Sequence, residues 1–182
     1  MAAGADNGMR GYLLTFLIAY VRDFACDHMI TAESFETSVP WSNVSQLVRR
    51  VTKRIFDETA KHGFTKEQVW VSFRVTQLYE TGAAIYVYMS LTHREQPREK
   101  IVAIYEEIED HARDETLASG GCISHHHGVG KLRKGFIERT LPKMAIKFQQ
   151  DVKTALDPQN IFGINNTVYR TEEEREEVLK KF

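Results

Sequence analysis

The clearest pattern in the chain is an alternation of apolar and mixed positions over two neighbouring segments. Residues 69–76 and residues 84–91 each carry an aliphatic or aromatic side chain at every second position. Side chains at every second position point to one face of a strand, so the pattern predicts two strands that each have an apolar face. Between them, Glu80-Thr81-Gly82 suits a three-residue hairpin loop with the glycine in a left-handed conformation.

The length of this loop sets the register of the hairpin and therefore predicts which side chains are neighbours. A three-residue loop places Thr76 opposite Tyr86 and Arg74 opposite Tyr88. Arg74 and Tyr86 are then diagonal neighbours on the face that is not the aliphatic core.

Apolar residues recur at three- and four-residue spacing in the rest of the chain and predict helices there. The helices are expected over residues 12–26, 42–61 and 98–118, and the first of these is apolar enough to be largely buried. A last long helix is expected between a cap at Thr140 and a stop at Asp157-Pro158.

The segments between these helices are predicted from shorter signals. Residues 29–32 suit a short strand, and residues 33–41 read as a link to the next helix, with Trp41 as a core anchor and Ser38 or Ser42 as a cap. The resulting order is helix, strand, helix, strand, strand, helix, loop, helix. This order predicts an α+β domain with an antiparallel sheet and flanking helices.

Few strands are visible, so we expect the full sheet to need strands from upstream of this chain. The expected organisation is a disordered leader over residues 1–9, the domain over residues 10–166, and a charged helical tail over residues 167–182.

Composition narrows the functional classes. In 182 residues, 42% are hydrophobic and 27% are charged, which is typical of a soluble globular protein. The net charge of -1 argues against a nucleic-acid partner. Cys26 and Cys122 are too few for a disulfide scaffold and favour a reducing compartment. The longest apolar run, residues 12–21, is shorter than the roughly 20 residues that a membrane span needs.

The most unusual feature is the run His125-His126-His127. In an extended segment these imidazoles alternate in direction, and only a bend, which Gly128 and Gly130 allow, turns them toward one ligand. The basic residues that follow could attract an anion, whereas a solvated surface loop is an equally good interpretation. A metal site is not expected, because no cysteine or carboxylate cluster accompanies the run.

Tyr86 and Arg22 are further candidates, each with an ordinary alternative. Tyr86 alone would be a strand aromatic, and it becomes a proton carrier only if cations such as Arg74 lower the pKa of its phenol. Arg22 would ordinarily form a surface ion pair, for which Asp23 is badly placed, but its guanidinium also suits a phosphate clamp.

Several segments together resemble one family, the alkyldihydroxyacetonephosphate synthases, in their C-terminal region. The resemblance runs from Tyr12 to about Asn166, and the triple histidine stands where related FAD-linked oxidases usually have Glu-His-Gly. The segments that carry it are Leu13-Leu14-Thr15-Phe16 with Ile18-Ala19-Tyr20-Val21-Arg22-Asp23, Glu33-Ser34-Phe35-Glu36-Thr37-Ser38 with Pro40-Trp41, Arg74-Val75-Thr76-Gln77, Ile85-Tyr86-Val87-Tyr88, Gly128-Val129-Gly130-Lys131-Leu132-Arg133-Lys134 and Asp157-Pro158-Gln159-Asn160-Ile161-Phe162-Gly163.

This resemblance implies a transferase of ether-lipid biosynthesis. The family exchanges the acyl group of acyl-dihydroxyacetone phosphate for a fatty alcohol, and FAD acts without net redox, its N5 holding the substrate covalently. By position, Tyr86 matches the family's proton donor and acceptor, Arg22 its substrate-binding arginine, and residues 125–127 its catalytic histidines. Of residues 164–168, only Asn166 resembles the functional C-terminal stretch of the family. We add Arg74, which the family does not imply, as a cation near Tyr86.

The resemblance also sets expectations for partners. The flavin-binding domain lies upstream in the family and outside this chain, so the chain alone is expected to bind FAD poorly and to be inactive. The family implies a homodimer, peripheral membrane association and a peroxisomal or glycosomal location, although the C-terminal Lys180-Lys181-Phe182 is not a Ser-Lys-Leu type signal. The alternatives are the cap domain of an FAD-linked 2-hydroxy-acid oxidoreductase and a non-catalytic remnant of the same fold.

Overall fold

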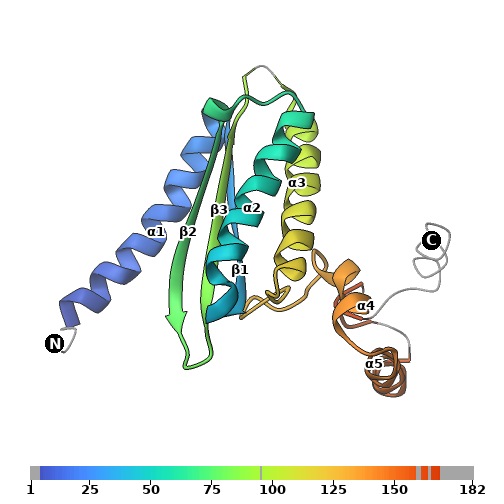
Figure 1. Ribbon diagram of the computed structural model, residues 1–182. Helices are drawn as coiled ribbons and strands as arrows, with labels where there is room; N and C mark the ends of the chain where they lie inside the picture. The colour runs from blue at the N-terminus through green and yellow to red at the C-terminus, as the bar shows by residue number, and fades with distance from the viewer. Residues whose placement is uncertain (1–4, 95, 159–160, 164, 169–182) are drawn as a thin grey trace. The chain divides into compact units, whose positions relative to one another are not determined.

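The computed structural model describes residues 5–94, 96–158, 161–163 and 165–168 (Figure 1). The chain divides into two units, of which the first ends at Cys122 and the second begins at Ile123. The predicted order of elements and the α+β class are confirmed, whereas the predicted charged helix in the tail lies outside the described residues. The first unit contains α1 (Ala5–Asp27), β1 (Ile30–Pro40), α2 (Trp41–Lys61), a 3-10 helix (Lys66–Gln68), β2 (Val69–Leu78), β3 (Gly82–Thr92) and α3 (Arg98–Ala118), and the second contains a 3-10 helix (Lys134–Phe136), α4 (Ile137–Thr140) and α5 (Lys143–Leu156).

The first unit is built on an antiparallel sheet with the strand order β1-β3-β2. The helices α2 and α3 lie together on one side of this sheet, and α1 runs along the other side (Figure 1). The alternating aliphatic positions of β3 face α2 and α3 and form the core with the apolar stripes of both helices. Its fully buried members include Leu47, Val51, Ile55, Ile85, Val87, Met89, Leu91, Ile101 and Ile108.

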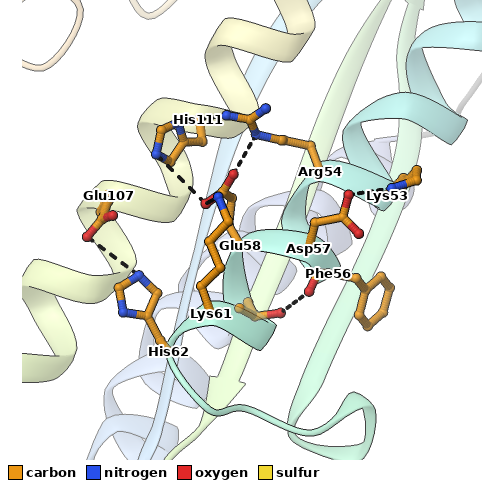
Figure 2. Close-up of polar contacts among 10 residues, drawn as sticks. Lys53, Arg54, Phe56, Asp57, Glu58, Lys61, His62, Glu107 and His111 are labelled. Atoms are coloured by element: carbon orange, nitrogen blue, oxygen red, sulfur yellow. Dashed lines mark hydrogen bonds and ion pairs between the residues drawn. The ribbon is translucent and has the colours of Figure 1, made fainter.

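A charged seam joins α2 to α3 beside this core (Figure 2). At its centre the Glu58 carboxylate is only 2% exposed and pairs with Arg54 Nε at 2.8 Å and Lys61 Nζ at 2.6 Å on α2, and with His111 Nε2 at 3.8 Å on α3. Burial opposes ionisation of Glu58, but the hydrogen bond from Lys61 and the neighbouring positive charges outweigh it and lower the pKa. A second pair, His62 with Glu107 at 3.5 Å, also crosses the seam.

The first strand is much longer than its predicted span of residues 29–32. β1 pairs with β3 continuously from Ile30 opposite Thr92 to Pro40 opposite Gly82. The interpretation of residues 33–41 as a link was therefore wrong, as was the core role of Trp41. This residue begins α2 about half exposed, and its indole N–H donates to the carbonyl of Tyr79 at 2.9 Å.

The hairpin forms where it was predicted, but its register differs by two residues. Arg74 lies directly opposite Tyr86: one residue of the difference arises beside the loop, where Leu78 pairs with Ala83, and the other at a bulge between Val75 and Gln77. Gly82 is not in the left-handed region and instead begins β3. A Cβ on this glycine would lie 2.3 Å from the carbonyl oxygen of Val39, so close approach to β1 is what requires glycine here.

The prediction that the first helix is largely buried was also wrong. Helix α1 packs mainly against the edge strand β1, and a helix that touches one strand covers only one stripe of its surface. Its exposed apolar side chains are Met9, Leu13, Phe16, Leu17, Ile18, Tyr20, Val21 and Phe24. Within the described ranges, the helices are too short or too polar to traverse a bilayer.

In the second unit, the last long helix starts later than predicted. Thr140 does not cap it but ends α4, where its hydroxyl donates to the carbonyls of Phe136 and Ile137. The predicted stop at Asp157 is confirmed. The hydrogen bond from Lys153 and those from the backbone N–H groups of Ile161 and Phe162 lower the pKa of Asp157 to about 2.

Candidate functional site

The sheet face turned away from α2 and α3 is called the polar face here. It carries Ser34, Glu36 and Ser38 from β1, Trp70, Ser72 and Arg74 from β2, and Ala84, Tyr86, Tyr88 and Ser90 from β3. Glu36 and Arg74 both lie opposite Tyr86 in the register, one from each side. A carboxyl group, a phenol and a guanidinium therefore form one row across the three strands, which we call the Tyr86 row.

The surroundings of Tyr86 favour its neutral form. Burial raises the pKa of the phenol, the charges of Glu36 and Tyr88 add to the rise, and Arg74 opposes it. Arg74 acts in the expected direction, but the groups of the first unit together raise the pKa of Tyr86, so the expected net lowering is wrong for this unit. Tyr86 and Tyr88 are stacked with ring centroids 5.9 Å apart, and the Arg74 guanidinium lies 6.0 Å from the centroid of Tyr88. The arrangement presents a protonated phenol, which is a proton donor.

Arg22 lies in the last part of α1. Its Nη1 contacts Glu33 Oε1 at 2.8 Å, and both side chains are about half exposed. The contact of its Nε with Asp23 is longer, at 3.8 Å. Glu33 lies three residues before Glu36 on β1, about 10 Å along the strand and, by the alternation of the strand, on the other face of the sheet. Arg22 thus forms the surface ion pair of the ordinary interpretation, with Glu33 as the main partner.

The histidine run lies in a bent loop of the second unit. The φ angles of Gly128 and Gly130 are 75° and 55°, so the bend that the sequence allowed is present. His125 Nδ1 and His126 Nδ1 are 2.9 Å apart, and the ring of His127 lies 4.3 Å from that of His126. A hydrogen bond between two imidazoles shares one proton, so one of these two nitrogens accepts. In the described part of the chain, no group of three or more histidine, cysteine or carboxylate side chains is placed to hold a metal.

Asn166 lies in a strained segment that contacts the histidine loop. Its neighbours Asn165 and Thr167 have φ angles of 62° and 54°, and the left-handed region is unusual for a β-branched threonine. The backbone N–H of Thr167 donates to the carbonyl of Gly130 at 3.0 Å. The segment therefore supports the loop just after the histidines.

The candidate residues divide between the two units. Arg22, Arg74 and Tyr86 belong to the first unit, and the histidine run and Asn166 belong to the second. Within the first unit, the register brings Arg74 and Tyr86 together. That all of these residues act on one substrate remains a prediction.

The sequence analysis missed Glu36 as a neighbour of Tyr86. Glu36 was assigned to a link, although Phe35, Thr37 and Val39 alternate with Ser34, Glu36 and Ser38 in the way a strand does. Recognising that alternation would have placed a carboxyl group on the polar face.

Comparisons with known proteins give one consistent result. The family described as FAD linked oxidases, C-terminal domain, matches residues 7–164. Alkyldihydroxyacetonephosphate synthase of Caenorhabditis elegans is 44% identical over 168 residues, which cover 92% of this chain and 28% of that protein. The proteins of the same name from Dictyostelium discoideum and Trypanosoma brucei brucei are 25% and 28% identical over 86% and 79% of this chain, and 25% and 22% of their own length.

A solved structure titled alkyldihydroxyacetonephosphate synthase in P212121 shares the fold, with a TM-score of 0.56 and 20% identity over 85% of this chain and 23% of that chain. The chain spans about a quarter of the length of the curated relatives it matches. The resemblance found in the sequence is thereby confirmed. Since the family match covers most of the chain, this protein belongs to the family of the C-terminal domains of FAD-linked oxidases, and it is similar to alkyldihydroxyacetonephosphate synthases.

Proposed function

We propose that this chain is the substrate-covering part of an alkylglycerone-phosphate synthase, which exchanges the acyl group of acyl-dihydroxyacetone phosphate for a fatty alcohol. The similarity to proteins named as that synthase supports the reaction class. The observation that carries the proposal is the Tyr86 row, which sets a phenol between a carboxyl group and a guanidinium. A phenol is one of the side chains that can give a proton to a carbon atom and take one from it.

In this proposal Tyr86 removes and returns the C1 proton of the substrate. A phenol has an ordinary pKa of about 10 and is protonated at neutral pH, and burial raises the pKa of Tyr86 further, so its O–H can deliver a proton to carbon. For the reverse transfer the phenolate must form first, and the opposing influence of Arg74 stabilises that anion. Glu36, on the other side of Tyr86, is the nearest carboxyl group in the register to exchange a proton with the phenol. The Tyr86 row therefore suits transfer of a proton from C1 of the substrate to the phenol and back.

The substrate phosphate would be held by Arg22 and the histidine run. An ion pair between two half-exposed side chains contributes only about 0–1 kcal/mol, so a phosphate dianion can replace Glu33 on the guanidinium at little cost. A phosphate also accepts two parallel hydrogen bonds from arginine. The neighbouring imidazoles of residues 125–127 add donors to the same anion, and the bent loop allows more than one of them to face it.

The polar face fits contact with a flavin. The stacked phenols of Tyr86 and Tyr88 and the guanidinium of Arg74 offer flat surfaces and a cation to a planar, electron-accepting ring system. When bound, FAD supplies an electron sink and a nucleophilic ring nitrogen without net redox. The part of the longer protein outside this chain would hold most of the FAD. The homodimer, the peripheral membrane association and the peroxisomal or glycosomal location belong to the same proposal.

The test uses the full-length protein that carries this chain. Tyr86→Phe should abolish exchange of the C1 proton of the substrate with solvent, measured by deuterium incorporation, while FAD remains bound. Tyr88→Phe is the matched control and should retain exchange. Unchanged exchange in Tyr86→Phe contradicts the proposed role. Dye-linked oxidation of D-lactate or glycolate by the same protein would favour the oxidoreductase alternative instead.

A further inference from the structure

The largest exposed apolar surface of the first unit lies on one face of α1. Six large apolar side chains between residues 13 and 24 are each 55–71% exposed. They follow one another at alternating steps of three residues and one residue, which places them along one side of a helix. We call this set the α1 stripe, and its members are Leu13, Phe16, Leu17, Tyr20, Val21 and Phe24.

The sheet does not cover the α1 stripe. Helix α1 packs mainly against β1, and the polar contact that ties its last turns to that strand is the ion pair of Arg22 with Glu33 at 2.8 Å. At 3.6 residues per turn, Arg22 lies roughly opposite the stripe on the helix. The side of α1 that carries Arg22 therefore meets β1, and the stripe faces away from this contact.

The composition of α1 favours protein rather than lipid as the partner of the stripe. Contiguous exposed apolar surface is typical of a place where a protein contacts something else. A helix that lies on a membrane surface usually opposes its apolar face with several lysines and arginines. Between residues 13 and 24 the single cation is Arg22, and it is already paired with Glu33. Among the described residues, no helix is long and apolar enough to span a bilayer either.

The relatives indicate which protein surface is the partner. The family match begins at residue 7, so α1 belongs to the domain that the family shares. The matched part makes up only 28%, 25% and 22% of the three relatives, so most of each relative lies outside it. We propose that the α1 stripe is the docking surface for the remainder of the longer protein, which would meet it with an apolar surface of its own.

This inference rests on the proposed function, which makes the chain one part of a synthase, and it adds a role for α1. A helix that is apolar on one side and tied to a strand on the other is suited to lie between two layers of one protein. Docking on the stripe would press α1 against β1 and so hold Arg22, on the opposite side of the helix, beside the sheet.

The first test compares the 182-residue chain with the full-length protein that carries it. Hydroxyl-radical oxidation, read by mass spectrometry, measures how exposed the rings of Phe16, Tyr20 and Phe24 are in each protein. We expect oxidation of all three rings to be severalfold lower in the full-length protein. Equal oxidation in the two proteins, which a lipid partner would give, overturns the inference. Protection already present in the 182-residue chain also overturns it, because a second copy or another part of the same chain then covers the stripe.

The second test is a matched pair of substitutions on α1, Leu17→Asn and Ile18→Asn. Leu17 lies in the stripe at 56% exposure, whereas its neighbour Ile18 lies off the stripe at 57% exposure, so the two variants differ mainly in the face that they change. In the 182-residue chain we expect both to leave the urea midpoint unchanged, since both sites are exposed there. In the full-length protein, Leu17→Asn should restore oxidation of the Phe16 ring severalfold and Ile18→Asn should not. Equal effects of the two variants contradict the docking role of the stripe.

The docking inference and the proposed function can fail separately, because neither of these tests uses substrate. Equal oxidation in the two proteins removes the docking surface and leaves the proton exchange assigned to Tyr86 in place. Unchanged exchange in Tyr86→Phe removes that assignment and leaves the protection of the stripe in place.

Discussion

The two faces of the sheet in the first unit use alternate residues of one strand for different purposes. On β3, Ile85, Val87, Met89 and Leu91 are at most 2% exposed and pack beneath α2 and α3. Tyr86 and Tyr88 stand between them and point to the polar face. The strand pattern of period two thus separates the residues that stabilise the fold from those that could act on a substrate.

The two faces should therefore respond differently to substitutions. Burial of apolar surface is the main stabilising contribution on the face covered by α2 and α3. The polar face holds a phenol, a carboxyl group and a guanidinium, which are poor choices for stability alone because removing them from water costs free energy. Substitutions on the first face should therefore affect folding, and substitutions on the second should affect chemistry.

The largest effect on stability is expected for Ile85→Ala. Ile85 is 1% exposed at the centre of the core, and truncating such a residue removes its transfer free energy and leaves a cavity. The free energy of unfolding should fall by about 2–5 kcal/mol, as measured by urea denaturation of the 182-residue chain. A loss of well under 1 kcal/mol would show that this face is not the main source of stability.

A smaller effect is expected at the charged seam. Glu58→Gln removes the charge that meets Arg54 and Lys61, and it should cost about 1–3 kcal/mol, near the low end because both cations can turn toward water. The control is Asp57→Asn on the same helix, whose exposed pair with Lys53 should be worth less than about 1 kcal/mol. Equal losses in the two variants would contradict the special role of the buried carboxylate.

The same residue predicts a dependence of stability on pH. The pKa of Glu58 is lower in the folded protein than in the unfolded chain, so its contribution is complete above the unfolded value of about 4.3 and disappears as the pH falls through the folded pKa. Wild-type protein should therefore lose more stability than Glu58→Gln on acidification below about pH 5. Parallel pH profiles for the two proteins would show that Glu58 does not contribute.

The smallest effect on stability is expected for Tyr86→Phe, next in sequence to Ile85. The phenyl ring remains stacked on Tyr88, and only the hydroxyl is lost, so the free energy of unfolding should change by about 1 kcal/mol or less. This is measured in the same urea titrations as Ile85→Ala. A loss as large as that of Ile85→Ala would mean that Tyr86 is a structural residue.

Regular patterns in the sequence predicted most of this fold, and local exceptions account for the errors. The sequence pattern predicted the helix over residues 98–118 with its bounds and the two hairpin strands to within two residues at each end. It did not predict the register, because the bulge near Thr76 depends on tertiary contacts and Gly82 serves a close approach to Val39 rather than a left-handed turn. Helix α1 is apolar in sequence yet exposed, since periodicity does not tell which surface is available to cover it.

The residues of the candidate site were also predicted only in part. The alternation along the hairpin put Tyr86 and Arg74 on one face, and the structure places them directly opposite each other. Glu36 was missed as a neighbour of Tyr86 because it depends on β1 pairing with β3, and the contacts of Cys122 with Thr37 and Ser38 were missed because they join residues more than 80 positions apart. Contacts between residues so far apart leave no pattern in the sequence around either residue.

The central claim is that the Tyr86 row, Arg22 and the histidine run serve one phosphorylated substrate. The most direct measurement is a crystal structure of the full-length protein with dihydroxyacetone phosphate bound. We expect the phosphate to contact Arg22 and at least one imidazole of residues 125–127. We expect the Tyr86 hydroxyl oxygen to lie within about 3.2 Å of the carbon atom that exchanges its proton. A phosphate bound away from Arg22, with Tyr86 facing no part of the substrate, would contradict this claim.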